Sequence, residues 1–284
     1  MKKRYDDYDY LEAYSKALED LDESSRQRVF GEDHRNMAYR TTTTRCGDER
    51  VEVDIYPSFG SRRDMPRTKR RRESRQAQKN LNEKRARRYL IQLACTNFGE
   101  KDYWCTLTYD GDHLPDDLKG CQKEFQKWIR KVNRLRKKKG LPGNARYIVI
   151  TEHTESVRAH HHVLIDGDLS RDELEDLWTC GKRNNFRRID PDDDFQIEGI
   201  ARYLGKDPKG RKRWSRSRNL KEPTVTRSYS RFSKRRVERM AMDEELLRER
   251  LEKSYPGCRM LDAKIRINDI NGGFYIYARM KRRC

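Results

Sequence analysis

The sequence predicts an α+β fold in which helices pack on an antiparallel sheet. Strand-like and helix-like segments follow each other in the order β-α-β-β-α-β between residues 103 and 189, which is the split βαβ arrangement. The two middle strands are separated by only the seven residues 153–159, as expected for a hairpin. Because 34% of the residues are hydrophobic and 40% are charged, we expect extensions outside the core.

Each element of this core has a local signal. The strands are rich in β-branched and aromatic residues. The long helix has an apolar stripe and is bounded by Pro115 and Gly140. The short helix begins with a capping box formed by Ser170 and Glu173. The expected strands are 103–109, 146–152, 160–166 and 186–189, and the expected helices run from Pro115 to Gly140 and from Ser170 to near Gly181.

The flanking segments give the domain organisation. Residues 1–72 are expected to be an extension, acidic and aromatic at first and ending in the basic run Arg67–Arg72. That run fits a nuclear-targeting or nucleic-acid patch, and equally a solvated charge cluster. Residues 73–230 form the expected endonuclease-sized core, opened by a helix over 74–98. Residues 231–284 are expected to add a helix over 233–253 and a β-hairpin turning at Asn271-Gly272-Gly273, packed on the core.

Composition points to a nucleic-acid partner. The chain has 66 Lys and Arg residues against 47 Asp and Glu, a net charge of +19, and such an excess attracts polyanions. An anionic membrane surface is the weaker alternative, and no apolar run approaches the ~20 residues needed to span a bilayer. The first residues lack the apolar segment of a signal peptide. Seven cysteines without a Cys-x-x-Cys pair favour a reducing compartment, so we expect a cytoplasmic protein.

The run His160-His161-His162 predicts a metal site. Alternation along a strand places His160 and His162 on one face and His161 on the other, where packing or exposure is expected. If the hairpin is symmetric about Ser156, Glu152 lies opposite His160 and supplies a third ligand; His153 is the alternative. Two imidazoles and a carboxylate suit Mn²⁺ or Mg²⁺ with open positions for phosphate oxygens. A structural zinc site is disfavoured, because no thiolate pair completes it.

A helical pattern over residues 196–206 carries Tyr203 and Lys206 three residues apart. A tyrosine hydroxyl with a pKa near ~10 needs help to attack a phosphodiester. A divalent ion can polarise the phosphate, and Lys206 can offset negative charge. The plainer interpretation is that Tyr203 packs at the edge of its helix.

Basic residues surround these positions and interleave with an aromatic residue, a pattern typical of nucleic-acid binding. The expected DNA-binding residues are Arg158, Lys209, Arg211, Lys212, Arg213, Trp214, Arg216 and Arg218.

Three ordered motifs resemble those of rolling-circle replication initiators of the HUH endonuclease superfamily, above all the phage-type initiators of small circular single-stranded DNA phages and bacterial plasmids. Residues 104–109, Trp-Cys-Thr-Leu-Thr-Tyr, are similar to the first motif. The run around His160 and His162 resembles the second, and Tyr203-Leu204-Gly205-Lys206 the third. Ser217-Arg218-Asn219-Leu220 followed by Pro223 also resembles a downstream stretch of the phage-type group.

The resemblance implies a ferredoxin- or RRM-like endonuclease core that nicks single-stranded origin DNA. Tyr203 would attack the DNA, remain bound to the 5′-phosphate and free a 3′-hydroxyl, with a divalent ion held by His160, His162 and Glu152. Host polymerase and helicase in a bacterial cytoplasm are the implied partners.

The sequence departs from the family in two ways. His161 replaces a bulky apolar residue, and no second tyrosine lies on the Tyr203 helix. Strand rejoining would then need a second subunit, an activated water or another tyrosine such as Tyr229. A transposase or relaxase of the same superfamily is an alternative function. A non-catalytic binder of single strands, with Tyr103, Trp104 and Tyr109 as a stacking platform, is another.

Overall fold

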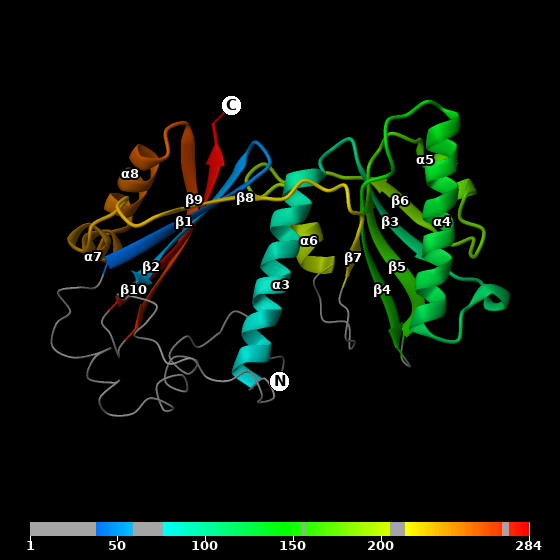
Figure 1. Ribbon diagram of the computed structural model, residues 1–284, viewed down its shortest axis with the longest axis horizontal. Helices are drawn as coiled ribbons and strands as arrows, with labels where there is room; N and C mark the ends of the chain where they lie inside the picture. The colour runs from blue at the N-terminus through cyan, green and yellow to red at the C-terminus, as the bar shows by residue number, and fades with distance from the viewer. Residues whose placement is uncertain (1–37, 59–75, 155–156, 205–213, 269–272, 284) are drawn as a thin grey trace. The chain divides into compact units, whose positions relative to one another are not determined.

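The computed structural model of the protein describes residues 38–58, 76–154, 157–204, 214–268 and 273–283. The chain divides into two compact units (Figure 1). Unit 1 combines Met1–Arg88 with Pro223–Cys284, and unit 2 is Tyr89–Glu222. The helix α3 (Gln76–Asn97) continues from the first unit into the second.

Unit 2 contains the β-α-β-β-α-β core that the sequence predicts. Its five-stranded sheet has the order β6-β3-β5-β4-β7, and every paired strand is antiparallel. The predicted α+β class with an antiparallel sheet is therefore confirmed. The strands are β3 (Tyr103–Thr108), β4 (Tyr147–Thr154), β5 (Val157–Ile165), β6 (Asn185–Arg188) and β7 (Ser215–Arg216).

Helices lie on both faces of this sheet. On one side are α4 (Leu118–Lys138) and α5 (Arg171–Asp176), and on the other is α6 (Glu198–Leu204) (Figure 1). A short 3-10 turn, η2 (Gly111–His113), precedes α4. The expected capping box starts α5, and Asp117 caps α4 by accepting from the Gly120 amide. The core between the sheet and α4 includes Phe125, Trp128, Val132, Leu107, Val149 and Val163.

The hairpin formed by β4 and β5 has the register that strand alternation predicts. Glu152 pairs with His160, and Ile150 pairs with His162. The ladder shifts between Glu152 and Thr154, so the irregularity falls just beyond these pairs. Because the shift follows Glu152, this carboxylate remains beside the histidines.

Unit 1 has its own five-stranded sheet, ordered β8-β1-β2-β10-β9. The hairpin around Asn271-Gly272-Gly273 is confirmed by the pairing of Gly273 with Asn268. Residues 38–58 were expected within the N-terminal extension, but they form β1 and β2, because their partner β10 comes from the other end of the chain. The strands are β1 (Ala38–Cys46), β2 (Arg50–Ser58), β8 (Thr224–Ser228), β9 (Cys258–Asn268) and β10 (Gly273–Arg282).

The helix expected over 233–253 is two helices, α7 (Lys234–Met242) and α8 (Glu244–Ser254). The break is at Asp243, which has an extended backbone and accepts from the Leu246 amide as the N-cap of α8. Both helices pack on the unit 1 sheet through a core that includes Val237, Met240, Leu247, Val53 and Ile276. None of the helices in the described part of the chain is long and apolar enough to cross a membrane.

Candidate metal and tyrosine site

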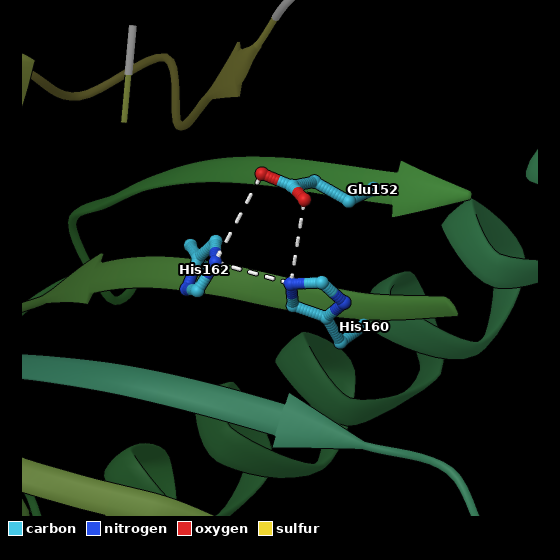
Figure 2. A group of neighbouring side chains, drawn as sticks. All are labelled: Glu152, His160 and His162. Carbon is cyan, nitrogen blue, oxygen red and sulfur yellow. Dashed lines mark hydrogen bonds and ion pairs between the residues drawn. The ribbon is translucent and has the colours of Figure 1, made fainter. Parts of the chain in front are cut away.

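Three donor side chains meet on the face of the unit 2 sheet opposite to α4. They are Glu152 from β4 and His160 and His162 from β5, and one ligand atom of each lies within 4.8 Å of the others (Figure 2). The Nε2 atoms of the two histidines are 3.1 Å apart. The Glu152 carboxylate oxygens lie 3.6 Å from His160 Nε2 and 4.0 Å from His162 Nε2. His153, the alternative ligand, does not belong to this group among the described residues.

Hydrogen bonds on the far sides of the rings orient the histidines. His160 Nδ1 is 2.9 Å from the Arg158 carbonyl oxygen, which can only accept, so Nδ1 carries the proton. In neutral His160 this leaves the Nε2 lone pair directed toward Glu152 and His162. His162 Nδ1 meets the Thr106 hydroxyl at 3.2 Å. Second partners of this kind fix the tautomer and orientation of metal-binding histidines.

The donor group fits a small divalent ion. Two ligands at right angles and about 2.1 Å from one ion are about 3 Å apart, close to the 3.1 Å between the two Nε2 atoms. Burial, and then the charge of His160, lower the pKa of His162 to about 4. His162 is therefore neutral at pH 7 and offers a lone pair without first losing a proton. One carboxylate and two neutral imidazoles suit Mn²⁺ or Mg²⁺.

His161 lies on the opposite face, as alternation predicts, and is fully buried beside α4. Its Nε2 is 2.7 Å from the Tyr109 hydroxyl, and its Nδ1 is 2.9 Å from the Thr151 hydroxyl. Burial is the main cause that lowers its pKa to about 3. The buried ring is neutral and has a partner at each nitrogen, so its position supports packing.

The helix α6 brings Tyr203 to the metal face. The Tyr203 ring is 5.3 Å from the His162 ring, centroid to centroid, and nearly perpendicular to it. Its side chain is half-exposed, with 46% of its surface open. Ala201 and Leu204 are buried on the same helix and anchor it. A tyrosine and the three metal ligands, more than forty residues apart in sequence, thus share one face.

Trp104 joins this group, although the sequence indicated it only as part of a motif and a possible stacking residue. Its ring stacks on His162 at a centroid distance of 5.7 Å and meets the Tyr203 ring edge-on at 5.7 Å. Because Trp104 and Thr106 are two residues apart on β3, alternation places both on the metal face. That parity was the signal in the sequence that could have identified them.

The predicted DNA-binding residues are distributed differently. Arg158 is exposed at the start of β5 and shares the strand face of His160. Arg216 pairs with Ile148 across β7 and β4 and forms an ion pair with Glu222 at 2.7 Å. The Trp214 ring lies 6.0 Å from Tyr89. Arg218 is exposed, whereas Lys206, Lys209, Arg211, Lys212 and Arg213 lie outside the described residues.

Comparison with known families gives one match over the segment that holds this site. Residues 102–208 match the family model of the replication-associated protein ORF2. The matched segment runs from β3 through α6 and contains Glu152, both metal-face histidines and Tyr203. It supports a role in DNA replication, and it leaves the strands and helices of unit 1 uncovered. Searches of curated proteins and of solved structures found no match.

Proposed function

We propose that this protein is a replication initiator that nicks single-stranded origin DNA with Tyr203 as the nucleophile. The observation that carries the proposal is the contact between the Tyr203 ring and His162, one of three clustered metal-ligand candidates. The family match over residues 102–208 supports the replication role independently.

The proposed reaction is a transesterification at one phosphodiester. The Tyr203 oxygen bonds to phosphorus, its proton passes to solvent, and the bond from phosphorus to the 3′ oxygen breaks. The 3′ oxygen takes up a proton and leaves as a hydroxyl, while Tyr203 keeps the 5′-phosphate. A host polymerase could extend that hydroxyl behind a host helicase.

Glu152, His160 and His162 would hold Mn²⁺ or Mg²⁺. When bound, such an ion draws charge from the phosphate oxygens and orients the phosphate for in-line attack. The neutral state of His162 and the proton on His160 Nδ1 keep both Nε2 atoms ready as ligands. Trp104, edge-on to Tyr203, would keep the nucleophile's ring from rotating away from the phosphate. Lys206 would offset charge on the same phosphate.

The test is a covalent-adduct assay. The protein is mixed with a labelled single-stranded oligonucleotide from the origin of its own replicon and with Mn²⁺, and the products are separated on a denaturing gel. We expect a labelled adduct with the wild-type protein. Tyr203→Phe and His162→Ala should each lose it, because one lacks the nucleophilic oxygen and the other lacks a ligand.

Tyr147→Phe is the matched control. Tyr147 is on β4 of the same sheet, but its ring packs against Phe125 under α4, on the opposite face. Its removal should leave the adduct unchanged. An adduct that persists in Tyr203→Phe, or forms equally in EDTA, would overturn the proposal and favour another nucleophile or a metal-free reaction. Salt-dependent binding without any adduct would favour a non-catalytic DNA-binding protein.

A further inference from the structure

A row of tyrosines and arginines crosses the face of the unit 1 sheet opposite to α7 and α8. The α7 and α8 face carries apolar residues such as Val53 and Ile276. Alternation turns the neighbouring positions of the same strands to the other face. At one end of that face, the five strands present Tyr229, Arg40, Tyr56, Tyr275 and Arg266.

The strand register places these five residues side by side. Arg40 of β1 pairs with Tyr56 of β2, and Tyr275 of β10 pairs with Arg266 of β9. Continuing the β2–β10 ladder by one position sets Tyr56 beside Tyr275. Just after β8, Tyr229 lies beside Arg40, whose guanidinium carbon is 4.9 Å from the ring centroid. We call this line of side chains the tyrosine–arginine row.

The row is accessible to a ligand to different degrees along its length. Tyr229 has 56% of its surface exposed, and the other four side chains are half-buried. Half-buried rings that stand on a sheet offer one flat face. Flat aromatic faces between guanidinium groups match a single strand, whose bases stack on rings and whose phosphates pair with arginines.

The charge of the surrounding face is also complementary to a polyanion. Its acidic residues are paired with arginines: Arg88 binds Glu52 at 2.8 Å and Asp54 at 2.7 Å, and Arg279 binds Asp262 at 2.7 Å. These acids therefore offer little repulsion to a phosphate backbone.

Further cations flank the row. Arg227 of β8 pairs with Thr42, two residues along β1 from Arg40, and is exposed. Lys264 of β9 is two residues from Arg266 on the same strand face and is also exposed. A second line of positive charge thus runs beside the first.

We propose that the tyrosine–arginine row is a binding site for single-stranded DNA, separate from the metal face of unit 2. The bases stack on Tyr229, Tyr56 and Tyr275, and the phosphates lie near Arg40 and Arg266. The site is in unit 1, outside the segment that matches the replication-associated family. It requires no nicking, so it stands whether or not Tyr203 is a nucleophile.

Equilibrium binding of labelled oligothymidine to the full chain in EDTA tests the site. Tyr229→Leu combined with Tyr275→Leu should weaken binding at least fivefold, because each lost base stack is worth about 1–3 kcal/mol. The matched pair Tyr229→Phe and Tyr275→Phe keeps both rings and should restore wild-type affinity. Arg40→Gln combined with Arg266→Gln should reduce the slope of log affinity against log salt by about 1.4.

The control for charge is Arg235→Gln. Arg235 is exposed on α7, which packs against the other face of the same sheet, so this change should leave oligothymidine binding within twofold of wild type. Binding unchanged by the leucine pair, while thermal unfolding shows a folded protein, would overturn the proposal. So would an equal loss of duplex affinity in the leucine pair, because stacked bases inside a duplex cannot reach the rings. Tyr203→Phe should keep wild-type affinity here, which separates this site from the proposed nicking reaction.

Discussion

The Thr106 hydroxyl meets Nδ1 of His162 at 3.2 Å, while Nε2 of the same ring faces Glu152. A partner at Nδ1 sets which nitrogen can bind a metal. We therefore expect Thr106→Val to weaken Mn²⁺ binding by about tenfold or more, as removal of second partners typically does. Isothermal titration calorimetry with Mn²⁺ measures it. Thr151→Val removes the hydroxyl bonded to His161 on the opposite face; it should leave Mn²⁺ affinity unchanged. Equal losses in both variants would contradict the role of Thr106.

Burial of His161 makes the stability of unit 2 sensitive to acid. Its pKa falls to about 3 in the folded protein, against about 6.5 in an unfolded chain. The unfolded state therefore binds more protons between these values. The free energy of unfolding should decrease as the pH falls from about 6.5 toward 3, by up to about 1.4 kcal/mol per pH unit. Urea unfolding at several pH values in EDTA measures this slope.

His161→Gln provides the comparison, because glutamine keeps a hydrogen-bonding side chain and does not titrate. We expect a shallower slope in this variant, with the remaining acid sensitivity coming from His162 and other groups. A slope identical to that of the wild type would show that His161 is protonated more easily than its burial implies.

Arg136 should contribute strongly to the stability of unit 2. Its guanidinium is buried, and it binds Asp166 at 2.7 Å and Asp168 at 2.8 Å. Because Arg136→Met would leave the buried Asp166 carboxylate without its main partner, the expected loss is about 3–5 kcal/mol. Arg134→Met, at an exposed position of the same helix, should change stability by less than about 0.5 kcal/mol. Urea denaturation of both variants checks the difference.

Two glycines of unit 2 should respond to alanine in opposite directions. A Cβ at Gly167 would overlap the Lys101 carbonyl oxygen, so Gly167→Ala should cost about 1–3 kcal/mol or more. A Cβ at Gly199, on α6, would have nothing within 4 Å. Gly199→Ala should gain up to about 1 kcal/mol from helix propensity, and it leaves Tyr203 on the same helix. Thermal unfolding that shows a loss at Gly199 would contradict this account of α6.

The sequence was sufficient for the local geometry of the candidate site. Alternation separated His161 from His160 and His162, and hairpin parity placed Glu152 beside His160. These predictions depend only on the two-residue period of a strand and on a short connection. The neighbouring Trp104 contact was not predicted, because a packing distance between β3 and α6 depends on tertiary structure.

The sheet of unit 1 could not be predicted in the same way. β1 contains Thr41 to Thr44, so both of its faces carry the same residue type and the alternation that identifies a half-buried strand is hidden. Its sheet includes β10, more than two hundred residues later. Pairings over such a separation leave no local signal in one sequence. The break at Asp243 was missed because the apolar pattern continues through it.

The nesting of the two units has a consequence for synthesis on the ribosome. Unit 2 begins at Tyr89 and finishes at Glu222, and the side chains of these two residues are hydrogen-bonded to each other. In unit 1, β10 lies between β2 and β9 although it is made after both. The whole of unit 2 therefore emerges, and can fold as a closed insertion, while β2 still waits with an open edge. Translation that stops before β10 would release a chain with a finished metal face and an aggregation-prone sheet.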